Sequence, residues 1–310
     1  LRCERDIALA SEAQSSMLPR LDMVPPGIEA SAQSISARQV GGDLYDLFAL
    51  PGNRVAFALG DTCGKGMGAA LLMVQTVTAL RSLAALYERP SQCIAHLNHL
   101  ATTVAYDVPL TTLFYGIVHL DDGRLVYCNA GHPAPIIDGE IVRTPAQPSL
   151  GAVDDAQYRD DEITLRPGST VVLVSDGVTE APGQESRFVG LDGVLREVRD
   201  AGAGISARDL VERLLALSQT GDADFEEDDA TVAVVRYRGP STVLRVAPRV
   251  DAVEPVLARI DGCDLPPADR LRLRLAVEEL LVNVIEHGRS ATSIEVTVVS
   301  RFDGVGVRIE

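Results

Sequence analysis

Four aspartates stand where a predicted strand meets a turn, and carboxylates placed in this way could hold divalent metal ions: Asp43, Asp61, Asp176 and Asp228. A glycine beside an aspartate leaves little steric bulk, so the chain can bring the carboxylate to the edge of a sheet. Several converging carboxylates form the oxygen-rich site that Mg²⁺ and Mn²⁺ prefer. Two metals bridged by one aspartate would lower the pKa of a bridging water and hold a phosphoryl oxygen. Taken singly, each aspartate is more simply explained as a turn former.

Other polar residues near these motifs have a structural explanation beside a chemical one. His132 could donate a proton to a leaving serine alkoxide, but the surrounding glycine and proline favour a structural turn. Lys65 could hold a phosphate, yet the GxxxxGK[ST] spacing is absent, so we expect local structure or a regulatory contact with the next helix. Cys63 is predicted to be a small buried residue and not a redox centre. His96 and His99 share a helix face but lack a third ligand, so we expect them at the surface or its boundary.

The elements that must position these residues indicate a layered α+β domain and not an alternating parallel fold. Helical patterns span 68–87, 91–105, 191–201 and 207–218. Short strand-like runs, many separated by glycine-containing turns, span 28–37, 54–59, 113–119, 125–129, 135–137, 141–143, 170–174 and 230–236.

A second region begins after the turn at 238–241, which marks a predicted domain boundary. A strand at 242–246, helices at 250–260 and 267–286, and two closing strands follow. Glu279 and Asn283 are four residues apart and share one helix face, where they could activate a water and hold Mg²⁺ on a nucleotide. The spacing alone is equally that of an ordinary amphipathic helix capped by Gly288. Asp303-Gly304-Val305-Gly306 lies inside the last strand pattern, and we interpret it as a hairpin.

The composition disfavours several classes of function. The 310-residue chain carries a net charge of −16, which repels phosphate backbones and anionic membranes. Its five cysteines form no CxxC pair, as is usual in a reducing compartment. The longest apolar stretches are strand-sized or interrupted, so we predict no membrane contact. The chain starts at Leu1, and we expect it to be a piece of a longer polypeptide in which residues 1–25 form a connecting helix.

Taken together, the motifs resemble the SpoIIE/RsbU-like branch of the PPM-type (metal-dependent) serine/threonine phosphatases. The matching segments are Gly41-Gly42-Asp43-Leu44-Tyr45-Asp46, Gly60-Asp61 with Gly64-Lys65-Gly66, Asn129-Ala130-Gly131-His132-Pro133, Ser175-Asp176-Gly177-Val178-Thr179-Glu180-Ala181 and Asp228-Asp229-Ala230-Thr231. The resemblance implies a PPM-type domain over 26–238, an antiparallel β-sandwich flanked by helices. It also implies two Mn²⁺ or Mg²⁺ ions at one end of the sheets.

The same resemblance implies a role for each site residue. Asp61 would bridge the two ions, and the carbonyl of Thr62 would bind the second. Asp176 and Asp228 would complete the shell of the first ion, and Asp43 would act mainly through bound water. The nucleophile would be a metal-activated water, without a phospho-enzyme intermediate.

Two details of this assignment stay open. Either Asp228 or Asp229 could be the ligand; we favour Asp228, because the family pattern is an aspartate followed by Asn or Asp, one variable residue and Thr. The family usually has Val-Ser after the bridging aspartate, where this chain has Thr62-Cys63. A change at Thr62 matters little if the ligand is its backbone carbonyl.

The segment from Glu279 to Gly288 is similar to the N-box of the GHKL (HATPase) ATPases, nearest the RsbW-like anti-sigma-factor kinases. This resemblance covers 242–310 and implies the N-terminal part of an α/β sandwich. Glu279 would be a general base and Asn283 a ligand of the Mg²⁺ that accompanies ATP. The chain ends before the Asp-x-Gly-x-Gly box of that family, so we expect this segment to bind ATP poorly or not at all.

These resemblances imply a phosphatase acting on the phosphoserine of a STAS-type anti-sigma-factor antagonist, in a bacterial partner-switching pathway. The kinase-like domain of the parent chain would connect to a sigma factor. We expect a cytoplasmic protein that could form a homodimer and has no nucleic-acid partner. The alternative is a catalytically silent pseudophosphatase that binds regulatory partners, but mutually repelling carboxylates retained without metal argue against it. A phosphodiester enzyme is disfavoured, because neither a P-loop nor an HD-like His-Asp pair occurs.

Overall fold

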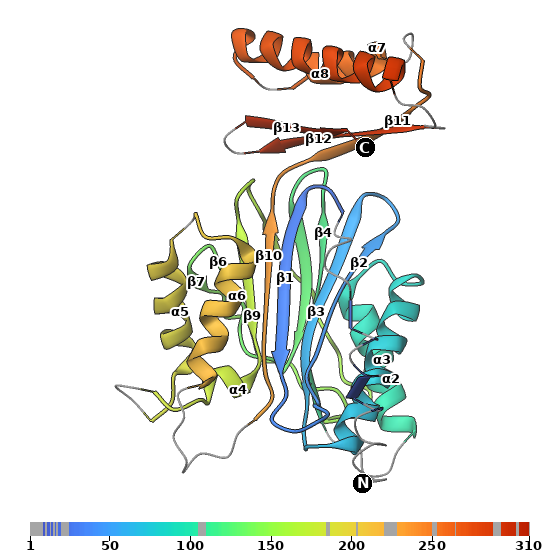
Figure 1. The fold of residues 1–310 in the computed structure, drawn as a ribbon. Coiled ribbons are helices and arrows are strands. Elements are labelled where there is room, and N and C mark those ends of the chain that lie inside the picture. Colours follow the sequence, from blue (N-terminus) through green and yellow to red (C-terminus); the bar gives the residue numbers. More distant parts are fainter. Residues whose placement is uncertain are drawn as a thin grey trace.

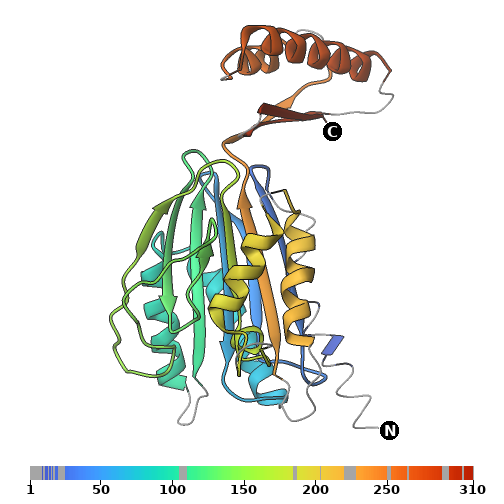
Figure 2. The same cartoon turned by 90° about the vertical axis from the view of Figure 1, so that its left-hand side faces the viewer.

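Two five-stranded antiparallel sheets pack face to face at the centre of the larger unit (Figures 1 and 2). The computed structural model describes residues 9, 11–12, 14, 16, 18–19, 25–104, 110–183, 187–202, 204–219, 228–249, 253–263, 265–287, 293–301 and 304–309. One sheet has the order β1 (Ile28–Ile35), β10 (Ala230–Tyr237), β9 (Thr170–Val174), β6 (Ile136–Ile137) and β7 (Glu140–Ile141). The other has the order β2 (Leu44–Leu50), β3 (Arg54–Thr62), β4 (Thr111–His119), β5 (Arg124–Ala130) and β8 (Asp161–Thr164).

The inner faces of the two sheets enclose one of the buried clusters of the core. Phe57, Phe114 and Tyr127 pack in a row, with ring centroids 5.8 and 5.2 Å apart. Val171 and Val235 of the facing sheet belong to the same buried cluster. Large apolar side chains therefore alternate inward from both sheets, as a β-sandwich requires.

Helices cover the outer faces of the sandwich (Figure 2). Helices α2 (Met67–Ala84) and α3 (Pro90–Val104) pack on the sheet of β2 to β5, and α5 (Gly190–Ala201) and α6 (Ala207–Leu215) pack on the other sheet. The short helices α4 (Asp176–Thr179) and η2 (Ala216–Gln219) lie beside α5 and α6. The expected α+β sandwich flanked by helices is therefore confirmed.

Helix α2 spans 18 residues, close to the helix predicted over 68–87, and it is strongly apolar. By length and composition it could cross a membrane, contrary to the expectation that the apolar stretches are too short. The side chains of Met73, Val77, Leu80 and Ala84 are buried against strands β2 to β4. Its hydrophobic residues are thus used as the inner face of a core helix.

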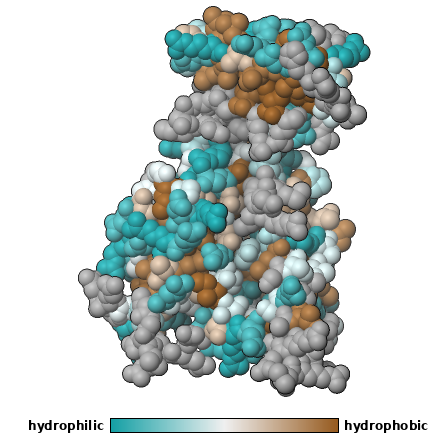
Figure 3. Space-filling model, viewed as in Figure 1, coloured by the Kyte–Doolittle hydropathy of each residue, from teal (hydrophilic) through white to brown (hydrophobic). Residues whose placement is uncertain are grey.

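A smaller unit follows the sandwich, beyond the end of β10 (Figure 1). It contains β11 (Ser241–Val246), α7 (Glu254–Asp261), α8 (Pro267–His287), β12 (Ile294–Arg301) and β13 (Gly304–Ile309). The sheet order is β11-β12-β13, and both helices cover one face of it around Val256, Leu257, Leu281 and Val296. β12 and β13 pair antiparallel from Val296 with Ile309 to Arg301 with Gly304, as the hairpin interpretation predicts. Apolar side chains also gather on the surface of this unit in Figure 3, and Leu271 and Leu275 of α8 are exposed.

Several boundaries differ from the sequence-based expectations. Strands β2 and β8 were not predicted, and β7 replaces an expected strand at 141–143 with only two paired residues. The expected helix near the N-terminus falls largely outside the described residues, although residues 9, 11, 12, 14 and 16 are helical. β2 was missed because Asp46 interrupts its apolar face, and its buried carboxylate pairs with Arg81 of α2 through two hydrogen bonds of 2.7 and 2.8 Å.

Candidate metal centre

The four predicted aspartates meet at one end of the sandwich because of the strand order. In one sheet, Asp43 directly precedes β2 and Asp61 lies at the end of its antiparallel partner β3. In the other, Asp176 follows the end of β9 and Asp228 precedes the start of its antiparallel partner β10. Antiparallel neighbours place the end of one strand beside the start of the next, so each sheet brings two carboxylates to the same edge.

Burial and mutual repulsion raise the pKa of these carboxyl groups. Asp43 is buried, and burial, followed by the charge of Asp61, raises its pKa well above the usual range. Burial also raises the pKa of Asp61, with further contributions from the charges of Asp228 and Asp229, while its side-chain contact with Asp43 acts in the opposite direction. Burial and the charges of Asp61 and Asp228 raise the pKa of Asp176 to about 6. Clustered negative charge of this kind is costly unless a cation joins it.

One oxygen atom in the cluster has a particular need for a partner. Asp43 Oδ2 accepts a hydrogen bond from Ser175 Oγ at 2.8 Å, whereas Asp43 Oδ1 is buried and has no hydrogen-bond partner among the described residues. Lys65 Nζ lies 3.6 Å from Asp228 Oδ1, and no other ion pair in the described part of the chain reaches the four aspartates. A buried unpaired oxygen beside like charges fits an oxygen-binding divalent cation.

The fit to a metal ion requires some adjustment of the side chains. Within the described ranges, no three His, Cys, Asp or Glu side chains already stand in a metal-ligating arrangement. Asp228 has a half-exposed side chain and Asp61 and Asp176 are partly exposed, so these three can rotate. Asp43 is fixed by burial and by Ser175. Three adjustable carboxylates therefore surround a fixed one.

Residues 62 and 63 differ from each other in the structure. Thr62 is buried, and its backbone carbonyl oxygen lies 2.7 Å from the position that a Cβ on Gly42 would take, which places this carbonyl against the Gly41-Gly42-Asp43 loop. Cys63 is exposed, so the expectation that it is buried was wrong. The chain leaves β3 at Thr62 and turns through Gly64, which has a φ of +102°, and this turn carries Cys63 to the surface. Burial and the charges of Asp61 and Asp176 raise the pKa of its thiol, which makes it a weak nucleophile.

One cationic side chain contacts the carboxylate cluster, and a second lies near Gly66. Lys65, the only lysine in the chain, contacts Asp228, in line with the local or regulatory role expected from the sequence. Arg38 was not singled out from the sequence; its Nη1 lies 3.9 Å from the position that a Cβ on Gly66 would take. The signal that could have found Arg38 is its place five residues before Asp43, on the same loop.

His132 has the structural role that the sequence favoured. It is buried, its Nδ1 lies 2.9 Å from Thr112 Oγ1, and Asn129 Oδ1 accepts a hydrogen bond of 2.8 Å from the His132 backbone N–H. Burial lowers the pKa of its ring to about 3, so the imidazole is neutral at physiological pH and lacks the imidazolium proton that a general acid would donate. His96 and His99 are exposed as expected, and His96 Nε2 is hydrogen-bonded to Tyr87 at 2.8 Å.

Glu279 and Asn283 are not part of this centre. Both are exposed on α8, in the unit that follows the end of β10, whereas Asp228 precedes its start (Figure 1). The full length of β10 therefore separates the two groups of predicted site residues.

The architecture is that of the PP2C phosphatases. A crystal structure of the RsbU and RsbW domains of Rv1364c from Mycobacterium tuberculosis superposes with a TM-score of 0.64 at 22% identity, covering 91% of this chain and 84% of that one. The SiaA-PP2C domain of Pseudomonas aeruginosa gives 0.66 at 20% identity over 76% and 97% of the two chains. RsbX in complex with magnesium gives 0.52 at 15% identity over 67% and 94%. At these identities the likeness defines the fold.

Sequence relationships define the family. The family model of stage II sporulation protein E (SpoIIE) matches residues 51–238, and the chain belongs to this family of serine phosphatases. The phosphoserine phosphatase RsbU of Bacillus subtilis is 28% identical over 242 residues, which cover 75% of this chain and 70% of RsbU. Protein IcfG of Synechocystis is 27% identical over 235 residues, covering 65% of this chain and 36% of IcfG. The chain thus spans about a third of the length of IcfG.

Proposed function

We propose that the sandwich is a metal-dependent phosphatase for phosphoserine or phosphothreonine in a protein, using two Mn²⁺ or Mg²⁺ ions. The observation that carries this proposal is the unpartnered buried Oδ1 of Asp43, beside three further carboxylates at one end of the sandwich. Family membership and the relation to RsbU support the reaction class, and a magnesium complex of RsbX, a protein of the same fold, supports the metal.

Each site residue has a separate role in this proposal. Asp61 would bridge the two ions, the carbonyl of Thr62 would bind one of them, and Asp176 and Asp228 would bind the other. Asp43 would act mainly through water, held by Ser175. The bound ions would supply an acidified water for attack on phosphorus and positive charge for the phosphoryl oxygens.

Arg38 and Lys65 would orient the phosphorylated substrate. The guanidinium of Arg38 presents several donors in a plane that suits a phosphate, and Lys65 adds a positive charge beside Asp228. Because His132 is buried and neutral, the leaving serine would take its proton from solvent at the open edge of the site. Arg38 and Lys65 therefore affect substrate affinity more than metal binding.

The expected substrate is a STAS-type anti-sigma-factor antagonist, whose dephosphorylation would release a sigma factor in a cytoplasmic partner-switching pathway. The relation to RsbU, a phosphoserine phosphatase, supports this class of substrate. A pseudophosphatase that only binds partners is the less favoured alternative, because all four aspartates are present at one end of the sandwich.

We also propose that 242–310 is the N-terminal part of a GHKL domain, with Glu279 as general base and Asn283 as a Mg²⁺ ligand. A sheet covered on one face by two helices, with both residues exposed on α8, supports this assignment. ATP with Mg²⁺ would be bound by a complete domain of this type, which would also provide the connection to a sigma factor. The connecting helix at 1–25 and the boundary near residue 240 complete the proposed domain organisation.

Phosphate release from a phosphoserine STAS-domain protein tests the proposed reaction. We expect release with Mn²⁺, none with EDTA, and a loss of about 10³-fold or more in Asp61→Asn, because removal of a group that stabilises charge in the transition state has effects of this size. Release that persists in Asp61→Asn would show that the site is misplaced. A folded protein that binds the substrate but releases no phosphate with any divalent metal would favour the pseudophosphatase.

A further inference from the structure

The adjacent aspartates 228 and 229 point in different directions. The side chain of Asp228 is 48% exposed and lies beside Lys65, whereas Asp229 is only 6% exposed. Asp229 Oδ1 accepts a hydrogen bond of 2.8 Å from the backbone N–H of Ala37, and Oδ2 accepts one of 2.6 Å from that of Gly42. Both oxygens of Asp229 are therefore occupied by the chain itself, while Asp228 faces the other carboxylates.

Asp229 joins the two ends of the loop that carries Asp43. Ala37 lies two residues after the end of β1, and Gly42 lies two residues before the start of β2. β1 pairs with β10, but β2 belongs to the other sheet. The Asp229 carboxylate, just before β10, thus connects the two sheets next to Asp43.

Glycines allow this close approach. A Cβ on Gly41 would lie 2.6 Å from Asp229 Oδ2, and a Cβ on Gly177 would lie 2.1 Å from the carbonyl oxygen of Asp229. Ser175 Oγ, which donates to Asp43, lies 3.3 Å from the same carbonyl oxygen. The glycine motifs beside Asp43 and Asp176 therefore both pack against Asp229, which explains why they occur next to these two aspartates.

We propose that Asp229 is a positioning residue that sets metal affinity by holding the Asp43 loop in place, and that it is not itself a ligand. The proposal rests on the proposed function of the site. If the Asp43 carboxylate is already held in place, no entropy is lost in ordering it when the ion binds. Loss of the two Asp229 hydrogen bonds therefore weakens metal binding without removing a ligand. Partners that orient metal ligands are typically worth about 10- to 100-fold in metal affinity.

Calorimetric titration of the whole chain with Mn²⁺ separates a positioning residue from a ligand. For Asp229→Ala we expect two ions to bind with a dissociation constant raised about 10- to 100-fold. For Asp229→Asn, whose amide keeps one acceptor oxygen, we expect a smaller increase of about 3- to 10-fold, because it retains one of the two hydrogen bonds. Asp228→Ala is the ligand control, and it should bind fewer ions.

Asp138→Ala is the matched structural control. The Asp138 carboxylate accepts hydrogen bonds of 2.8 Å from Ser169 Oγ and from the backbone N–H of Thr170, at the start of β9 and away from the cluster. This variant loses a similar pair of hydrogen bonds and should leave the Mn²⁺ affinity unchanged. An equal loss of affinity in Asp138→Ala would show that general loosening, and not the Asp43 loop, is responsible.

Other outcomes would overturn the proposal. Asp229→Ala that binds Mn²⁺ like wild type would remove the positioning role, and Asp229→Ala that loses one ion would make Asp229 a ligand. If Asp229→Ala does not fold, the same titration is made with Asp229→Asn. An unchanged Mn²⁺ affinity, or the loss of one ion, in Asp229→Asn would contradict the proposal. A wild-type chain that binds no Mn²⁺ would refute the proposed function as well, whereas wild-type binding with unaffected Asp229 variants would refute this inference alone.

Discussion

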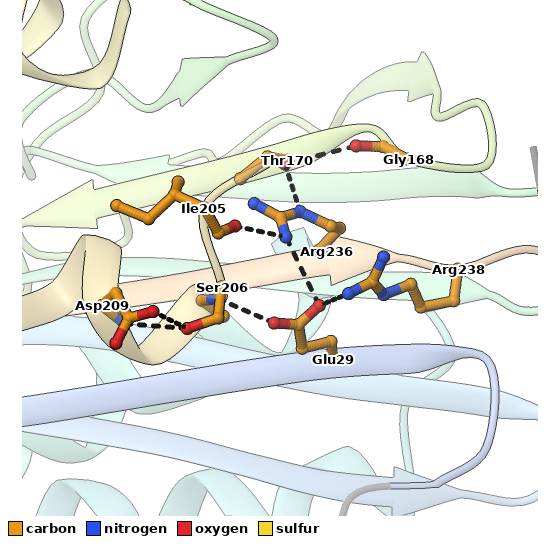
Figure 4. Close-up of polar contacts among 9 residues, drawn as sticks. Glu29, Gly168, Thr170, Ile205, Ser206, Asp209, Arg236 and Arg238 are labelled. Carbon is orange, nitrogen blue, oxygen red and sulfur yellow. Dashed lines mark hydrogen bonds and ion pairs between the residues drawn. The ribbon is translucent and has the colours of Figure 1, made fainter. Parts of the chain in front are cut away.

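Strand β10 begins near four aspartates and ends near two arginines. The two ends differ in whether their charged side chains have partners of opposite charge. At the far end, Arg236 is buried, and its guanidinium donates to the carbonyl of Ile205 at 2.8 Å and to Thr170 Oγ1 at 2.9 Å (Figure 4). Glu29 lies 3.4 Å from the same guanidinium and also pairs with Arg238. Each charge at this end has an opposite charge beside it.

The same carboxylate also stabilises a helix. Glu29 Oε1 accepts a hydrogen bond of 2.7 Å from the backbone N–H of Ala207, at the first turn of α6, and Ser206 caps that helix through the N–H of Asp209 (Figure 4). A negative charge at a helix N-terminus is favourable. The network thus joins β1, β10 and α6, and its role is explained by the fold alone.

Among the described residues, the four aspartates at the start of β10 have fewer cationic partners than Glu29 has at its end. Asp43, Asp61 and Asp176 have raised pKa values because of burial and repulsion, and Lys65 lies beside Asp228, whose side chain is 48% exposed. Charges that serve the fold are paired within the fold, as Glu29 and Arg236 are. Charges left unpaired in a stable protein indicate a ligand of opposite sign.

Breaking the balanced end should have the largest effect on stability. Arg236→Ala leaves Glu29 partly buried with one partner fewer and removes the bond to Ile205. We expect a loss of about 3 kcal/mol in the free energy of unfolding, because the carbonyl of Ile205 loses its donor and the partly buried Glu29 keeps only Arg238 as a cationic partner among the described residues. Urea denaturation measures this, and a loss below about 1 kcal/mol would contradict the role assigned to the network.

Removing a charge at the aspartate end of β10 should raise the free energy of unfolding. The pKa of Asp176 is about 6 in the folded chain and near 3.8 without burial, so ionisation at pH 7.5 costs stability. In EDTA, we expect Asp176→Asn to stabilise the chain by about 1–2 kcal/mol, after allowing for solvent screening of this partly exposed group. A loss of stability in Asp176→Asn would contradict the repulsion between Asp176 and the other carboxylates of the cluster.

The pH dependence of that difference gives an internal check. As the pH falls from 7 through 6 toward 4, the folded wild-type chain takes up a proton at Asp176 before the unfolded chain does, which stabilises the fold. The advantage of Asp176→Asn should therefore shrink over this range. Denaturation curves at pH 7.5 and pH 5 measure it, and an advantage that grows on acidification would be inconsistent with the raised pKa.

An exposed ion pair supplies the smallest effect. Arg208 and Glu212 pair at i, i+4 on the surface of α6, at 3.2 Å. We expect Arg208→Ala to change stability by about 0.3 kcal/mol, because solvent screens such pairs. A loss close to that of Arg236→Ala would show that burial does not account for the stability assigned to the network.

The predicted fold class is confirmed, and the aspartates of the candidate site are marked by local sequence signals. Each of them lies beside a glycine or within two residues of a strand end. The contacts that organise the site link distant positions: Asp229 bonds to Gly42, 187 residues away, and Arg236 to Glu29, 207 residues away. No local pattern contains such pairs, so the role of Asp229 and the balanced network could not be predicted.

Strand β2 and Cys63 show the same limit at the level of single elements. Asp46 looks like a loop residue in the sequence, and only the distant Arg81 makes its burial in a strand acceptable. Cys63 was predicted to be buried from its type, whereas the turn through Gly64 determines its exposure. Arg38 was missed because its neighbour Gly66 comes from another loop.

Thermal unfolding with and without metal tests most directly whether the unbalanced carboxylates form a divalent-cation site. A ligand at about 100 times its dissociation constant stabilises a protein by about 2.7 kcal/mol. We therefore expect millimolar Mn²⁺ to raise the unfolding midpoint of the wild-type chain by about 5 °C relative to EDTA, and to have little effect on Asp61→Asn. Equal midpoints in EDTA and in Mn²⁺, or an equal rise in Asp61→Asn, would contradict the account.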